Sequence, residues 1–218
     1  MRRMADTRCL IVLSETFDRA LVFASRLHRK QLRKTSGAPY VAHLLGVAAL
    51  VLEDGGSEDE AIAALLHDSI EDQARYYPGG AAQLAADIER EFGAEAARIV
   101  EACTERSSPI ERGIPDKRQR WRVHRQAYID GVAAKDSSVR RVSCADSLYN
   151  VRAMTRDYLR LGDKIWERFL TGSRDDQLWA YDGIARALVR GGGGALAQEL
   201  DRAVEELFRV TGVERTAA

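Results

Sequence analysis

Helical periodicity is the feature that most limits how this chain of 218 residues can fold. Apolar residues recur at intervals of three and four along most of its length, while the strict apolar–polar alternation typical of half-buried strands is nearly absent. The first predicted helix covers residues 16–29, and its apolar face comprises Phe17, Ala20, Leu21, Ala24 and Leu27. The pattern therefore predicts an all-α fold.

Glycine, proline and capping residues divide the rest of the chain into further helices. The second helix is predicted at 39–53, and the pair Ser57 and Glu60 has the spacing of a capping box that opens a third helix running through Asp72. Ser138 is the expected N-cap of the longest helix. The remaining helices are predicted at 81–92, 94–103, 117–135, 139–161, 163–170, 174–190 and 195–210, with a loop at 105–116.

The length suits a single domain with one core. We expect residues 14–190 to form one helical domain of the phosphohydrolase type discussed below. Residues 191–218, a glycine-rich turn followed by a helix, are expected to be part of the same unit.

The charge balance limits the class of partner. The chain contains 33 Lys and Arg residues and 33 Asp and Glu residues, so its formal net charge is zero. A protein that binds nucleic acid is expected to carry a basic excess, so the balance argues against that class. It leaves room for a local basic pocket that binds a small phosphorylated molecule.

Cysteine usage and apolar runs indicate the compartment. Cys9, Cys103 and Cys144 are odd in number and far apart, with no C-x-x-C pair, so neither a disulfide framework nor a cysteine zinc site is expected. Reduced thiols are typical of the cytoplasm. The apolar run at 9–13 is too short for a signal-peptide core or a membrane span. We therefore expect a cytoplasmic protein that does not enter a membrane.

Ionisable residues follow the apolar part of the third predicted helix. His67 and Asp68 are adjacent, and Glu71 and Asp72 follow four residues later, so a continuous helix would stack them in two rows. Burying such groups without a partner is costly, which makes a cation a natural companion. The alternative is that these residues form only the solvated end of a helix.

Two more candidates lie far away along the chain. His43 stands in PYVAH just before an apolar helical stripe, and Asp146 lies inside the helix predicted at 139–161, with Asn150 one turn later. Either residue could instead be a hydrogen-bonded core histidine or a solvent-facing aspartate. If the side chains meet, two imidazoles and two carboxylates suit Mn²⁺ or Fe²⁺, and Zn²⁺ or Mg²⁺ stay open.

Three sequence blocks together resemble a known family. The segments HRKQLRKTSGAPYVAH, IAALLHDSIED and ADSLYNVR are similar to the HD superfamily of phosphohydrolases. More narrowly, they resemble the hydrolase domain of the Rel/Spo stringent-response enzymes, in particular the small alarmone hydrolases, over about residues 17–160. The resemblance implies a metal-dependent enzyme that hydrolyses the 3′-pyrophosphate of (p)ppGpp to GDP or GTP and pyrophosphate, with a small-molecule nucleotide as its partner.

The resemblance also implies roles for individual residues. The metal ligands would be His43, His67, Asp68 and Asp146, and the metal is usually manganese in this family. The acidic pair that positions or activates the attacking water would be Glu71 and Asp72. The substrate-binding residues would be Arg33 and Lys34, near the base and phosphates, and Asn150, beside the metal-binding helix.

Some positions depart from the family pattern. Ser147 stands where a basic residue often follows the metal-binding aspartate, and Gln73 stands where threonine is frequent. Trp179 and Tyr181 could close a base pocket or belong to the core. The segment 105–125 could reach distal phosphates or be a solvated helix face, and its basic residues are Arg106, Arg112, Lys117, Arg118, Arg120, Arg122 and Arg125.

Other functions remain open at this point. The substrate could be an adenine alarmone, (p)ppApp, or another nucleotide, because spacing along the chain does not define the shape of the base pocket. A non-catalytic nucleotide sensor built on the same fold is a second class. A purely structural helical bundle is a third, and it predicts no bound metal.

Overall fold

The computed structural model describes residues 11–106, 108–169 and 173–216, and within them every regular element is a helix. The all-α expectation is confirmed. A single isolated bridge, between Leu32 and Pro39, is the one β-type pairing among these residues. The helices are α1 (Glu15–Leu27), α2 (Val41–Glu53), α3 (Glu58–Leu66), η1 (Ser69–Gln73), η2 (Ala74–Tyr76), α4 (Gly80–Phe92), α5 (Ala94–Cys103), α6 (Pro109–Arg112), α7 (Lys117–Val132), α8 (Ser137–Leu161), η3 (Gly162–Arg168), α9 (Arg174–Arg190) and α10 (Gly194–Thr211).

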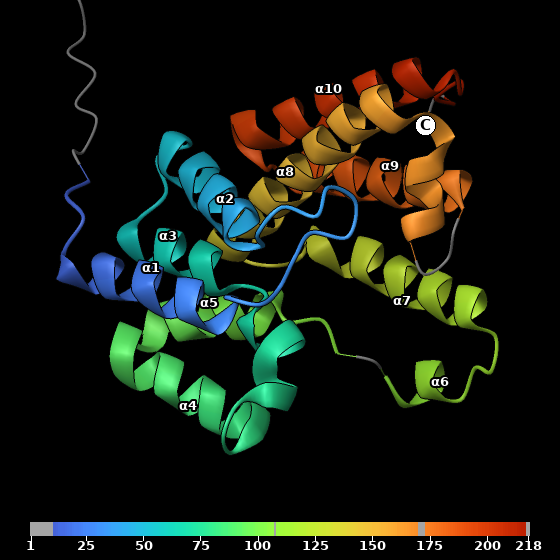
Figure 1. Cartoon of the computed structure of the whole chain (residues 1–218). Coiled ribbons are helices and arrows are strands. Elements are labelled where there is room, and N and C mark those ends of the chain that lie inside the picture. Colours follow the sequence, from blue (N-terminus) through green and yellow to red (C-terminus); the bar gives the residue numbers. More distant parts are fainter. Residues whose placement is uncertain (1–10, 107, 170–172, 217–218) are drawn as a thin grey trace, which may run out of the picture.

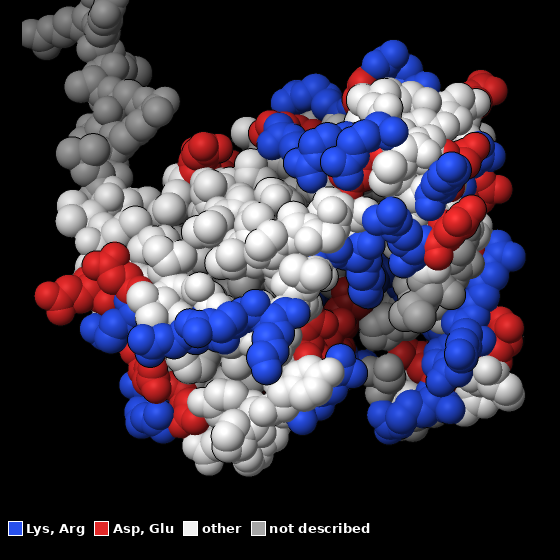
Figure 2. All heavy atoms as spheres, viewed as in Figure 1, with Lys and Arg blue, Asp and Glu red and all other residues white. Residues whose placement is uncertain are grey.

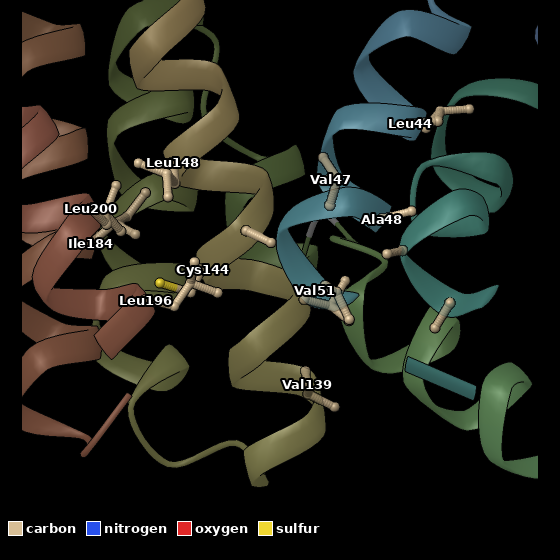
Figure 3. Close-up of a cluster of buried hydrophobic side chains, with 14 of the residues drawn as sticks. Leu44, Val47, Ala48, Val51, Val139, Cys144, Leu148, Ile184, Leu196 and Leu200 are labelled. Atoms are coloured by element: carbon tan, nitrogen blue, oxygen red, sulfur yellow. The ribbon is translucent and has the colours of Figure 1, made fainter. Parts of the chain in front are cut away.

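Helix α8 is the centre of the fold. It packs against α2, α3 and α5 on one side and against α9 and α10 on the other (Figure 1). Figure 3 shows this arrangement in the core, with α8 between the apolar side chains of α2 and those of α9 and α10. The labelled core residues are Leu44, Val47, Ala48 and Val51 of α2, Val139, Cys144 and Leu148 of α8, Ile184 of α9, and Leu196 and Leu200 of α10.

The start of α8 differs from the sequence prediction. Asp136, not Ser138, is the N-cap, and its carboxylate accepts a hydrogen bond of 3.0 Å from the amide of Val139. Both residue types are good N-caps, so the sequence pattern alone did not distinguish them. The end is as expected, because Gly162 has a φ of 61°, a conformation that favours glycine.

The third helix is shorter than predicted. The capping box of Ser57 and Glu60 is present, but α3 ends at Leu66 and His67 is its C-cap. A π-helical turn, η1, then covers Ser69–Gln73. The expectation of one continuous helix with two stacked rows of ionisable residues is therefore wrong. Single π turns are frequent at functional sites, where they redirect side chains.

Smaller differences affect the second half of the chain. The predicted loop at 105–116 contains the short helix α6, and the predicted helix at 163–170 is the 3₁₀ helix η3. Cys103 and Cys144 are free thiols, whereas Cys9 lies outside the described residues. Among the helices described, none has the length and apolar character needed to span a membrane.

Candidate active site

Four side chains from three distant parts of the chain meet at one point between α2, α3 and α8. The Nε2 atom of His43 lies 3.4 Å from Oδ2 of Asp68 and 3.2 Å from Oδ1 of Asp146. The Nε2 atom of His67 lies 3.0 Å and 3.6 Å from the same two oxygens. Both histidines are buried. The fold thus brings together the four residues that the sequence named as metal ligands.

The donor atoms of this cluster fit a divalent cation. Within the described residues, Nε2 of His43 and Nε2 of His67 are buried without a hydrogen-bond partner. Nδ1 of His67 lies 2.8 Å from the carbonyl oxygen of Ala64, so Nδ1 carries the proton and Nε2 presents its lone pair to the carboxylates. Leaving such nitrogens unsatisfied is costly, and a cation would satisfy them. Ligand atoms of His43, His67 and Asp146 lie within 4.8 Å of one another.

Neighbouring polar side chains orient the two carboxylates. The hydroxyl of Tyr40 donates to Oδ2 of Asp68 at 2.5 Å, and the amide of Asn150 donates to Oδ1 of Asp146 at 2.7 Å. Burial opposes ionisation of Asp146, but the adjacent imidazoles of His43 and His67 outweigh it and hold its pKa below the ordinary value. Burial raises the pKa of Tyr40, so its hydroxyl remains a donor.

A pocket of about 330 Å³ opens beside the cluster. Of the nine residues predicted for the site, all but His43 line it: Arg33, Lys34, His67, Asp68, Glu71, Asp72, Asp146 and Asn150. Figure 2 shows acidic surface inside a hollow near the middle of this face, with Lys and Arg side chains around it. The pocket therefore combines an acidic interior with basic groups that can face an anion.

The acidic pair lies on the π turn η1. Burial raises the pKa of Glu71 to about 7, with further contributions from the charges of Asp68 and Glu105. Oδ2 of Asp72 accepts a hydrogen bond of 2.6 Å from the amide of Gln31. Gln73, the residue that departs from the family pattern, donates to the side-chain oxygen of Gln31. Gln73 thus fixes the side chain of Gln31, which in turn orients the carboxylate of Asp72.

The basic pair lies on the loop between α1 and α2. Arg33 donates to Oδ1 of Asn150 at 2.6 Å, and its guanidinium lies 5.7 Å and 5.8 Å from the ring centres of Tyr40 and Tyr149. This loop is tied to α8, since the hydroxyl of Thr35 donates to the buried carboxylate of Asp157 at 2.6 Å. Lys34, in contrast, is exposed while still lining the pocket.

The basic residues of the segment 105–125 differ in their surroundings, and two of them fit neither expectation, distal phosphates or a solvated helix face. Arg118 and Arg122 each lie 2.6 Å from an oxygen of the fully buried Asp176, so these two residues stabilise the fold. Arg125 lines the pocket. Of the two aromatic candidates, Tyr181 also lines the pocket, whereas Trp179 packs beneath the guanidinium of Arg122 at 4.4 Å.

Sequence reasoning missed several residues that line the pocket. The missed residues are Gln31, Tyr40, Glu105, Trp121 and Tyr128. Tyr40 could have been found, because it belongs to the PYVAH block that includes His43. Nothing in the local pattern distinguished Glu105, which stands in a stretch that looked like a loop.

Comparisons with known proteins place this geometry in context. A family described as HD domain matches residues 20–176. The guanosine-3′,5′-bis(diphosphate) 3′-pyrophosphohydrolase MESH1 of Mus musculus is 30% identical over 194 residues, covering 88% of this chain and 92% of its own length. The guanosine-3′,5′-bis(diphosphate) 3′-pyrophosphohydrolase of Aquifex aeolicus (strain VF5) is 33% identical over 141 residues, covering 65% of this chain and 18% of its own length.

A solved structure shares the fold. It is that of a metazoan ortholog of SpoT, described as hydrolysing ppGpp, and it matches with a TM-score of 0.66 and 23% identity. The match covers 94% of this chain and 100% of that one. The similarity therefore extends over nearly the whole helical arrangement, including the C-terminal helices.

Proposed function

The chain belongs to the HD domain family, and on that premise we propose that it hydrolyses the 3′-pyrophosphate of (p)ppGpp, giving GDP or GTP and pyrophosphate. The resemblance inferred from the three sequence blocks is confirmed by this membership. Relatives that align over most of the chain are guanosine-3′,5′-bis(diphosphate) 3′-pyrophosphohydrolases, so the chain is an enzyme of this type.

One observation carries the proposal. Two buried imidazole nitrogens that have no hydrogen-bond partner among the described residues face two carboxylates, and the carboxylates of Glu71 and Asp72 line the same pocket. In a purely structural helical bundle such an arrangement would only lower the stability of the fold, because buried nitrogens without hydrogen bonds are costly. A phosphohydrolase needs both a cation site and a nearby proton acceptor.

The HD domain implies a divalent metal, and the cluster of His43, His67 and Asp146 fits one. We propose Mn²⁺, held by these three residues and Asp68, because two imidazoles and two carboxylates suit it; Fe²⁺, Zn²⁺ and Mg²⁺ are the alternatives. When bound, the ion polarises a phosphoryl oxygen and lowers the pKa of a coordinated water.

The acidic pair handles the proton of the attacking water. A new bond forms between the water oxygen and phosphorus, the bond from phosphorus to the ribose 3′-oxygen breaks, and that oxygen takes up the proton that Glu71 accepts from the water. Glu71 accepts the water proton, since its only hydrogen bond within the described residues is a long one of 3.4 Å from the amide of Glu105. Asp72, held by Gln31, orients the water.

The basic loop and Asn150 bind the nucleotide. Arg33 uses one N–H for Asn150 within the described residues, which leaves other donors for phosphate oxygens. Lys34 adds a second positive charge, and Asn150, which is hydrogen-bonded to Asp146, contacts the ribose. The zero net charge supports a small nucleotide rather than a nucleic acid as the partner, and the free thiols of Cys103 and Cys144 support a cytoplasmic location.

Turnover of two alarmones side by side tests the proposal. The purified chain is incubated with Mn²⁺ and either ppGpp or ppApp, and GDP, ADP and pyrophosphate are quantified by ion-exchange chromatography. We expect ppGpp to give GDP and pyrophosphate in equal amounts. Faster turnover of ppApp would favour the adenine alternative. Tight binding without turnover, after Mn²⁺, Fe²⁺, Zn²⁺ and Mg²⁺ have each been supplied, would indicate a sensor instead.

A further inference from the structure

Arg125 of α7 is a positively charged residue that lines the pocket and has no role in the reaction proposed above. We propose that Arg125 binds the 5′-diphosphate of the substrate, and that a chain of side chains from Glu105 through His124 to Glu111 holds it in place. This inference rests on the proposed function, because it assigns the second phosphate group of the same substrate.

Neighbouring side chains fix the position of the Arg125 guanidinium in the pocket. Its carbon centre lies 5.7 Å from the ring centre of Trp121 and 5.6 Å from that of Tyr128, and all three residues line the pocket. Its Nη1 donates to Oε1 of Glu105 at 3.0 Å. Within the described residues this is its only hydrogen bond, although a guanidinium has five N–H donors. Donors therefore remain for an anion.

Arg125 and Arg33 are held in a similar way by different parts of the fold. Among the residues that the structure describes, each guanidinium lies near two aromatic rings and makes one hydrogen bond to a side-chain oxygen. Arg33 is joined through Asn150 to Asp146, and thus to the metal cluster. Arg125 lies on α7, an element that supplies none of the four clustered residues.

This division matches the two anionic groups of the substrate. The 3′-pyrophosphate must lie at the cluster, where its bond is broken, and Arg33 is the arginine tied to that cluster. The 5′-diphosphate carries a comparable charge and needs a cation of its own. Arg125 supplies it from outside the cluster, and the planar fork of its guanidinium suits phosphate oxygens.

Glu105 is shared between Arg125 and His124, so within the described residues it leaves most N–H donors of Arg125 available. Its Oε2 lies 2.7 Å from Nε2 of His124, and Nδ1 of His124 lies 2.7 Å from Oε2 of the buried Glu111. With a carboxylate at each nitrogen, the imidazole is doubly protonated and positive. Hydrogen bonds to Glu105 and Glu111 raise the pKa of His124 to about 8, consistent with that state. The two cations and two carboxylates leave Glu105 fixed and Arg125 available.

Comparing two substrates distinguishes a loss of 5′-diphosphate binding from a general loss of activity. One is ppGpp, and the other is guanosine 3′-diphosphate, which has the same scissile group but a free 5′-hydroxyl. Arg125→Gln should lower kcat/KM for ppGpp by about 10- to 100-fold, mainly through KM, because a hydrogen-bonded charge is lost. For guanosine 3′-diphosphate it should stay within about threefold of the wild type.

Matched variants complete the experiment. Arg125→Lys keeps the charge and the aliphatic stem and guards against misfolding of Arg125→Gln; it should lose less on ppGpp and nothing on the shorter substrate. His124→Gln should weaken the preference for ppGpp in the same direction, as expected for a positioning residue. Arg120→Gln, on the same helix but outside the pocket, should leave both substrates unchanged.

The outcomes distinguish the two levels of inference. If the wild type hydrolyses neither substrate, the proposed function fails. If the wild type hydrolyses both and the Arg125 variants lower both equally, or change neither, then the function stands and the assignment of Arg125 to the 5′-diphosphate is overturned. Selective loss on ppGpp with normal metal content supports it.

Discussion

Asn150 donates a hydrogen bond to Asp146 across one turn of α8, with 2.7 Å between Nδ2 and Oδ1. The same amide accepts a hydrogen bond of 2.6 Å from Arg33, a residue 117 positions away along the chain. One side chain thus couples the proposed metal centre to the proposed phosphate-binding loop. The hydrogen bond between Arg33 and Asn150 also ties the loop between α1 and α2 to α8.

Replacing Asn150 tests that coupling. Asn150→Ala removes the donor to Asp146 and the acceptor for Arg33 together, and we expect kcat/KM for ppGpp to fall by about 10- to 100-fold, as for other residues that orient a metal ligand. Asn150→Asp keeps the acceptor for Arg33 but places a second carboxylate beside Asp146, so its kcat/KM for ppGpp should be no higher than that of Asn150→Ala. Steady-state kinetics check both variants, and wild-type kinetics in either would show that the coupling has no role.

The metal centre is tested by removing one ligand at a time. His67→Ala and Asp146→Ala should reduce bound manganese from one ion per chain to background and abolish turnover. Elemental analysis of the dialysed protein measures the metal, and circular dichroism verifies that the helices remain. His124→Gln is the control, since this histidine lies outside the cluster and should keep the metal. Full metal content in both ligand variants would exclude the proposed centre.

The acidic pair should affect turnover without affecting the metal. Glu71→Gln preserves size and polarity but cannot accept a proton, so kcat should fall by about 10²- to 10⁴-fold while manganese is retained. Asp72→Asn should also lower kcat, because the Gln31 amide would then face an amide that can donate as well as accept. Parallel kinetics and metal analysis give the answer. An active Glu71→Gln variant would remove Glu71 from the mechanism.

The contacts of His124 predict a pH dependence of stability. Its pKa is raised from 6.5 to about 8 in the folded protein by hydrogen bonds to Glu105 and Glu111. Protonation therefore stabilises the fold fully below about pH 6.5, and this contribution is lost as the pH rises through about 8. We expect His124→Gln to be less stable than the wild type at pH 6 by on the order of 1 kcal/mol, with a smaller difference at pH 9.

Urea unfolding at the two pH values measures this difference. A gap between the wild type and His124→Gln that stays constant, or widens toward pH 9, would contradict the assignment of a doubly protonated imidazole. His124→Gln also removes the hydrogen bond that positions Glu105. The same protein preparation can therefore be used to measure both its unfolding free energy and its kcat/KM for ppGpp.

Gly46 provides a test of helix packing near the site. A Cβ atom at this position of α2 would overlap the ring of Tyr149 on α8, and that ring packs edge-on against His43 with 5.0 Å between ring centres. Gly46→Ala should therefore destabilise the protein by about 1–3 kcal/mol and lower its manganese affinity. Gly131→Ala is the matched control, because a Cβ there meets no atom of the described part of the chain within 4 Å.

In that control the alanine should be neutral or should stabilise α7 by about 0.5–1 kcal/mol, as expected for glycine replacement inside a helix. Thermal unfolding with and without Mn²⁺ compares the two variants. Equal stability of Gly46→Ala and Gly131→Ala would mean that α2 and α8 can separate without cost.

Much of the fold could be predicted from the sequence, because helical periodicity and capping are local properties. The bounds of α5 and α9 agree with the prediction, and the capping box of Ser57 and Glu60 is present. Predictions failed where two local choices were equivalent or where the backbone departed from a regular helix. Asp136 replaced Ser138 as a cap, and the π turn after Asp68 interrupted the expected third helix.

The sequence alone determined which groups could carry the chemistry, because residue types and the three motif blocks are written along the chain. Tertiary structure decided which of these groups meet. It brought His43 and Asp146 to the His67–Asp68 pair, and it separated Arg125, in the pocket, from Arg118 and Arg122, which are bound to Asp176. The physical reason is that helix packing sets the directions of side chains distant along the chain, and no local pattern contains those directions.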